Sequence, residues 1–116
     1  MTSVLVLKQV WLDAILHGEK RMELRGCASR KVGQTIYLMA SKTNSITGKA
    51  TIASCKPLTE DEFQQARALH KSTAASKPYK KTFGWMLTNV ECIVPLHHVR
   101  KRGCIGFSVY EKAETA

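Results

Sequence analysis

Short segments rich in β-branched and other apolar residues recur along the whole chain, and they constrain its fold more than any other feature. They cover residues 3–9, 21–25, 30–41, 43–58, 82–96 and 104–111. Within residues 21–25, Met22 and Leu24 alternate with charged side chains, which is typical of a half-buried strand. The pattern predicts about six β-strands.

Two segments carry the signals of helices. Residues 10–17 place Trp11, Ala14 and Ile15 on one face, and Gly18 follows where a left-handed residue ends many helices. In residues 59–69, Thr59 and Glu62 have the spacing of a capping box, in which each side chain bonds to the backbone of the other residue. We therefore expect helices near residues 10–17 and 59–69.

Together these elements predict one α+β domain over residues 1–116: a small β-barrel of about six strands with two or three short helices. No apolar run approaches the roughly 20 residues that cross a bilayer, and no signal peptide precedes the first strand. We expect a monomer in the cytoplasm or nucleus, without membrane association.

The charge balance points to a polyanionic partner. The chain has 18 Lys and Arg residues against 9 Asp and Glu residues, a formal net charge of +9. Such an excess favours RNA or a nucleotide as the partner. The four cysteines form no CxxC pair, and the spacing of Cys92, His97, His98 and Cys104 matches no zinc motif. We predict neither a metal nor a cofactor.

Several segments, in order, resemble the ASCH domains of the PUA-like superfamily. The opening "LKQVWLDAILHGEKRMELR" is similar to the family's first strand and helix, followed by its Gly-x-Lys-x-x-Glu-x-Arg motif, here Gly18, Lys20, Glu23 and Arg25. "YKKTFGWMLTNVECIVPL" and "RKRGCIGF" resemble later strands of the family. Val10 and Phe107 depart from it, where Pro and Trp are common. The resemblance implies a PUA-like barrel with a cleft beside the first helix, lined by this motif.

Such a cleft would explain why residues 17–26 carry so many charged side chains. Met22 and Leu24 would enter the core, while Lys20, Glu23 and Arg25 would face an anionic or nucleobase ligand. The planar guanidinium of Arg25 suits phosphate, and Glu23 could accept hydrogen bonds from base amino groups. The alternative is a surface ion pair of little energetic value. Because the core face belongs to other residues, we expect substitutions of the charged residues to change folding little.

Further basic and aromatic residues extend the predicted RNA-binding surface, because stacking rings and cations suit unpaired RNA. The predicted binding residues are Lys8, Gln9, Trp11, Lys20, Glu23, Arg25, Tyr79, Lys80, Lys81, Arg100 and Arg102. We expect Tyr79 to be exposed and Trp85 to pack in the core.

Two other functions stay open. Some bacterial members of the family that this chain resembles are amidohydrolases that act on N-acetylated cytidine. In these relatives the residue three positions after the cleft lysine is a threonine, proposed as the nucleophile. Here that position is Glu23, whose carboxylate cannot form the same acyl-enzyme. Lys20 and Glu23 are the candidate catalytic pair if the protein is a hydrolase of modified nucleosides or RNA, with His70 a weaker candidate. A protein-interaction module in transcription or RNA metabolism is the third alternative.

Overall fold

The structure is a computed structural model that describes residues 2–99 and 107–110. Its elements are β1 (Thr2–Leu7), α1 (Gln9–Leu16), β2 (Met22–Arg25), β3 (Thr35–Ala40), β4 (Ser45–Leu58), α2 (Glu60–Gln65), α3 (Arg67–His70), β5 (Thr82–His97) and β6 (Phe107–Tyr110). The six strands and short helices confirm the predicted α+β class.

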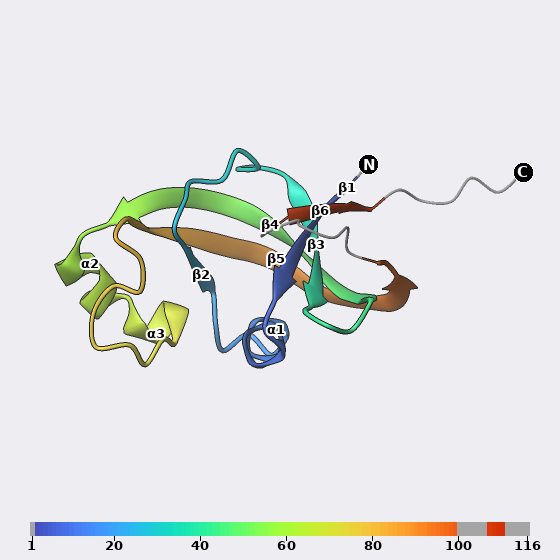
Figure 1. The fold of residues 1–116 in the computed structure, drawn as a ribbon, viewed down its shortest axis with the longest axis horizontal. Coiled ribbons are helices and arrows are strands. Elements are labelled where there is room, and N and C mark those ends of the chain that lie inside the picture. The colour runs from blue at the N-terminus through green and yellow to red at the C-terminus, as the bar shows by residue number, and fades with distance from the viewer. Residues whose placement is uncertain (1, 100–106, 111–116) are drawn as a thin grey trace, which may run out of the picture.

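All six strands belong to one mixed sheet, in the order β2-β5-β4-β3-β1-β6. β1 runs parallel to β3, and the other neighbouring strands are antiparallel. The long strands β4 and β5 run along the longest dimension of the molecule (Figure 1). Irregularities in register interrupt their pairing at three places, and such bulges bend a strand pair. The sheet is therefore a curled half-barrel with β2 and β6 at its edges.

The main core lies between this sheet and α1. Leu12 and Ile15 of α1 are buried in one cluster with residues of β1, β3, β4 and β5. Trp85 belongs to this cluster and is buried, as expected. A second cluster buries Val4 and Val6 of β1 away from the first, so β1 is covered on both faces and its position is well determined.

The predicted helix at residues 59–69 is wrong in one respect, because it is two helices. Thr59 forms the expected capping box with Glu62, but α2 ends at Gln65 and Ala66 separates it from α3. The rings of Phe63 and His70 stack with their centroids 4.6 Å apart. Seven residues of straight helix rise about 10.5 Å, so these rings can meet only because the helix breaks. No helix in the described ranges is long and apolar enough to cross a membrane.

Candidate functional site

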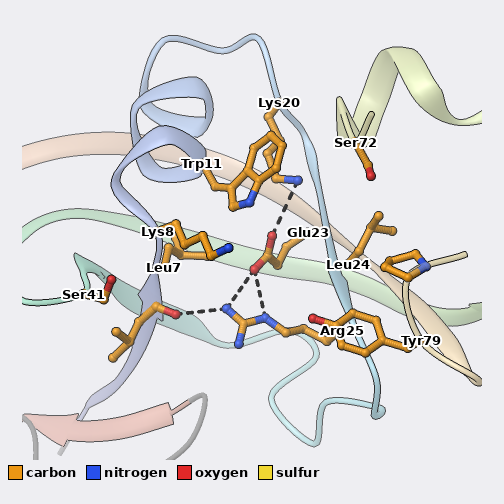
Figure 2. Close-up of a pocket in the computed structure, with 12 residues that line it drawn as sticks. Leu7, Lys8, Trp11, Lys20, Glu23, Leu24, Arg25, Ser41, Ser72 and Tyr79 are labelled. Carbon is orange, nitrogen blue, oxygen red and sulfur yellow. Dashed lines mark hydrogen bonds and ion pairs between the residues drawn. The ribbon is translucent and has the colours of Figure 1, made fainter. Parts of the chain in front are cut away.

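A cavity of about 370 Å³ opens beside α1, against β1, β2 and the loop that precedes β5 (Figure 2). It combines charged, aromatic, apolar and hydroxyl side chains. The lining residues are Val6, Leu7, Lys8, Trp11, Lys20, Glu23, Leu24, Arg25, Ser41, Ser72, Pro78 and Tyr79. Its volume lies within the usual range of small-molecule sites, about 300–1,000 Å³.

Strand β2 places a carboxylate at this cavity. Met22 and Leu24 pack in a cluster with Phe63, and successive side chains of a strand point to opposite faces. Glu23 therefore points away from that cluster, although its side chain is only 6% exposed. Met22 and Leu24 are buried, as expected, and Leu24 also lines the cavity.

Arg25 holds one oxygen of Glu23 through a hydrogen bond from Nε and an ion-pair contact from Nη2. Its Nε and Nη2 atoms lie 2.9 and 2.8 Å from Glu23 Oε2 (Figure 2). Nη2 also donates to the main-chain oxygen of Val6 at 3.0 Å, which ties β2 to β1. Within residues 2–99 and 107–110 the structure shows hydrogen bonds or ion pairs for Nε and Nη2 of Arg25 and none for Nη1.

Lys20 approaches the other oxygen of Glu23 from the turn before β2. Its Nζ atom lies 3.5 Å from Glu23 Oε1, donates to the His70 main-chain oxygen at 2.7 Å, and sits 4.5 Å from the centre of the Trp11 ring. The residue is 2% exposed. Burial lowers the pKa of Lys20 below its ordinary value of 10.5, while the neighbouring Glu23 opposes this shift. The predicted cluster is therefore an enclosed network rather than a solvated surface pair.

Aromatic rings and a third cation complete the site. Trp11 is partly buried on α1, while Tyr79 is 44% exposed on the loop before β5, as expected. Lys8 is exposed where β1 passes into α1. The arrangement offers cations for an anion, a carboxylate for amino groups, and rings for stacking with a planar ligand.

The structure brings only some of the predicted binding residues together. Lys8, Trp11, Lys20, Glu23, Arg25 and Tyr79 line the cavity. Gln9 is not among the lining residues, and its amide donates to Asp13 Oδ1 at 2.8 Å along α1. Lys80 and Lys81 are exposed and lie outside the lining. Arg100 and Arg102 are outside the described residues, so their place in the predicted surface stays a prediction.

Sequence reasoning missed several lining residues. They are Val6, Leu7, Ser41, Ser72 and Pro78. Val6 and Leu7 look like ordinary strand residues, and nothing in the sequence indicates that the Val6 carbonyl accepts a hydrogen bond from Arg25. Ser72 and Pro78 lie in the polar stretch between α3 and β5. Only the packing of that loop beside β2 reveals their position.

His70 does not fit the weaker catalytic role considered for it. Its side chain is fully buried and does not line the cavity. The Ser72 N–H donates to Nδ1 at 2.9 Å, and Nε2 lies 2.8 Å from the Phe63 oxygen. Since Nδ1 accepts, the ring hydrogen is on Nε2 and points at Phe63. Both ring nitrogens are thus occupied by the protein itself.

None of the described cysteines lines the cavity. Cys92 is exposed on β5, and Cys104 lies outside the described residues. Across the ranges that the structure covers, three or more His, Cys, Asp or Glu side chains nowhere gather in an arrangement that could hold a metal ion.

Comparison with known proteins agrees with this fold. The model of the ASCH domain family matches residues 5–97. Among solved structures, a serine-to-alanine variant of an ASCH protein from Zymomonas mobilis has a TM-score of 0.72 at 15% identity, covering 96% of this chain and 89% of that one. A tyrosine-to-phenylalanine variant has a TM-score of 0.65 at 17% identity, covering 83% and 75%.

A further structure titled ASCH from Zymomonas mobilis has a TM-score of 0.57 at 20% identity, covering 83% of this chain and 73% of that chain. At these identities the structures show a common fold. No curated protein matches the chain. The family match covers most of the sequence, and the curled sheet agrees with it; the chain belongs to the ASCH domain family.

Proposed function

We propose that the protein binds RNA or a nucleotide in the cavity beside α1. The observation that carries the proposal is the enclosed network of Lys20, Glu23 and Arg25 on the cavity wall. Burying three charged groups is costly unless they are paired. An apolar side chain at these positions would fill the space without that cost, so the network is better explained by recognition than by packing.

The cavity has the groups that such a ligand needs. Lys8, Lys20 and Arg25 contribute three cations against the single carboxylate of Glu23. Arg25 Nη1 suits a phosphate oxygen, and Tyr79 offers an exposed ring on which a base can stack. We also propose that the protein is a monomer. An RNA ligand would place the protein in the cytoplasm or nucleus.

The binding test compares two cavity variants with a charge-matched control. Lys20→Met keeps most of the buried volume, and Lys8→Ala removes an exposed cation; Lys49→Ala removes a cation whose partner is Glu91 on an exposed part of the sheet. We expect Lys20→Met to weaken binding of a labelled oligouridylate by about 1–3 kcal/mol and Lys8→Ala by less. Fluorescence anisotropy measures these affinities.

If both cavity variants bind like wild type, or if Lys49→Ala weakens binding equally, the cavity is not the RNA site. A melting curve for each variant separates loss of binding from loss of folding.

A hydrolase is the second candidate, favoured by one observation. Lys20 has a lowered pKa and lies 3.5 Å from Glu23 Oε1, an arrangement in which an amine and a carboxylate could exchange a proton with a bound substrate. The cavity is large enough for a small ligand, so its size does not favour a protein-interaction module instead.

The assay for the second candidate is incubation with total RNA and with acetylated nucleosides, scoring retained ligand and hydrolysis products separately. Glu23→Gln is the informative variant. If it abolishes a product that wild type forms while ligand retention persists, the hydrolase function replaces simple binding. Retained ligand with no product from wild type leaves the binding function in place.

A further inference from the structure

His70 lies behind the cavity and connects to two of its walls. Its main-chain oxygen accepts the 2.7 Å hydrogen bond from Lys20 Nζ, and its Nδ1 accepts the 2.9 Å hydrogen bond from the Ser72 N–H. Lys20 and Ser72 both line the cavity (Figure 2). Its side chain is fully buried against Phe63. One residue therefore positions a cation and a loop of the candidate site.

We propose that His70 is a positioning residue for ligand binding, and that protonation of its imidazole loosens both Lys20 and Ser72 and weakens the site. The proposal rests on the proposed function, because it assumes that the cavity binds the ligand. The imidazole holds the Ser72 N–H only while Nδ1 is an acceptor. Protonation turns Nδ1 into a donor that faces another donor, so this hydrogen bond must break.

The surrounding charges increase the consequence of protonation. The charged groups that act on the ring are Lys20, from the turn before β2, and Arg67, on α3. Arg67 also holds the loop, donating to the oxygens of Ser72 and Ala74 at 2.9 and 2.7 Å. A cationic His70 would repel both groups at once. We expect the loop to loosen rather than unfold, since the Arg67 contacts involve main-chain oxygens that protonation leaves intact.

The pKa of His70 is lowered in the folded protein, so the imidazole can act as an acceptor for the Ser72 N–H at neutral pH. Burial lowers it below the ordinary value of 6.5, the hydrogen bond to the Phe63 oxygen opposes this, and Lys20 and Arg67 lower it further. The ring is thus neutral in the folded protein at neutral pH. Its contribution to stability is present above the ordinary value and is lost as pH falls through the lowered folded value.

Two substitutions separate the two hydrogen bonds of the His70 ring, one with the Ser72 N–H and one with the Phe63 oxygen. His70→Asn can place an oxygen near the Nδ1 position, so it can keep the acceptor for Ser72 without titrating. His70→Gln can place an amide N–H near the Nε2 position, so it can keep the donor to Phe63 but loses the acceptor. His17→Gln is the control, because His17 is exposed at the end of α1 and lines a second pocket together with Trp11.

The first experiment needs no ligand. Lys20 Nζ lies over the Trp11 ring, so the indole N–H resonance of Trp11 reports the position of that cation. Between about pH 8 and about pH 5, we expect the Trp11 indole and the Ser72 amide to shift together in wild type. The shifts should persist in His17→Gln and vanish in His70→Asn.

The second experiment measures affinity for an oligouridylate over the same pH range. Wild type should weaken as pH falls, whereas protonation of the exposed histidines alone would strengthen binding of an anion. His70→Gln should bind about 2- to 10-fold more weakly than His70→Asn at neutral pH, the effect of one lost hydrogen bond. Melting curves identify a variant that fails to fold. If both His70 variants fail to fold, the pH dependence of wild-type affinity alone tests the role of His70.

The outcomes distinguish the two proposals. A Trp11 indole and Ser72 amide that stay constant in wild type, or a wild-type affinity that rises as pH falls, would overturn the role of His70. Coupled shifts without oligouridylate binding at any pH would leave His70 as the residue that positions Lys20 and would contradict the proposed function instead.

Discussion

At the scale of single residues, burial changes what the charged motif does. The sequence suggests that Lys20, Glu23 and Arg25 can be replaced without harm to folding, because Met22 and Leu24 carry the core face of β2. In the structure Lys20 and Glu23 are 2% and 5% exposed, and Arg25 joins β2 to β1 through the Val6 oxygen. The charges are part of the folded framework as well as of the candidate site.

Arg25→Met should therefore lower stability by about 2–4 kcal/mol, since Oε2 of the buried Glu23 loses both of its Arg25 contacts and the Val6 oxygen loses its donor, although Lys20 stays beside Oε1. Leu24→Ala should lower stability by about 2–5 kcal/mol through loss of packing. The two substitutions should therefore cost similar amounts of stability. Lys49→Met breaks an exposed pair with Glu91 and should change stability by less than about 1 kcal/mol. Urea unfolding measures all three, and an Arg25→Met variant as stable as wild type would contradict the structural role.

At the scale of elements, the start of α2 is determined locally and its end is determined by packing. Thr59 and Glu62 form the capping box expected from their spacing, and the backbone and side chain of Thr59 together with Lys56 lower the pKa of Glu62 from 4.5 to about 2. The break at Ala66 has no such local signal. It allows His70 to fold back on Phe63 and present its carbonyl to Lys20.

Thr59→Ala should lower stability by about 1 kcal/mol, because the N–H of Glu62 loses its acceptor, whereas Thr59→Ser should stay close to wild type. Because the pKa of Glu62 is lowered on folding, its contribution is present above the ordinary value of 4.5 and is lost as pH falls toward about 2. Denaturant midpoints at neutral and acidic pH test this. Equal midpoints for the alanine and serine variants would show that the cap contributes nothing.

At the scale of the whole molecule, the excess of basic residues sets the strength of long-range attraction. The formal net charge of +9 exceeds what the cavity alone supplies, so basic residues elsewhere should also attract a polyanion. Each phosphate contact releases counterions, which makes affinity depend on salt. The cavity provides the defined part of this dependence through Lys8, Lys20 and Arg25.

Oligouridylate affinity should fall as salt rises, with a slope of log affinity against log salt of about −2 if these three cations each contact a phosphate of a single strand. Lys8→Ala should make the slope shallower by about 0.7, and uridine itself, without phosphate, should show almost no dependence. Affinities measured across a salt series test this. A flat response for wild type would argue against phosphate contacts.

The sequence by itself determined the features that depend on nearby residues: the strands, α1 with its left-handed Gly18, the cap at Thr59, and the motif that carries the family resemblance. Only the tertiary structure decided that Lys20 is buried, that the predicted helix breaks at Ala66, and that Ser72 and His70 lie beside the motif. These properties depend on which distant segments meet: Lys20 contacts an oxygen 50 residues away. Periodicity and capping are local signals, whereas burial and long-range hydrogen bonds arise only when the sheet curls and brings the loop before β5 against β2.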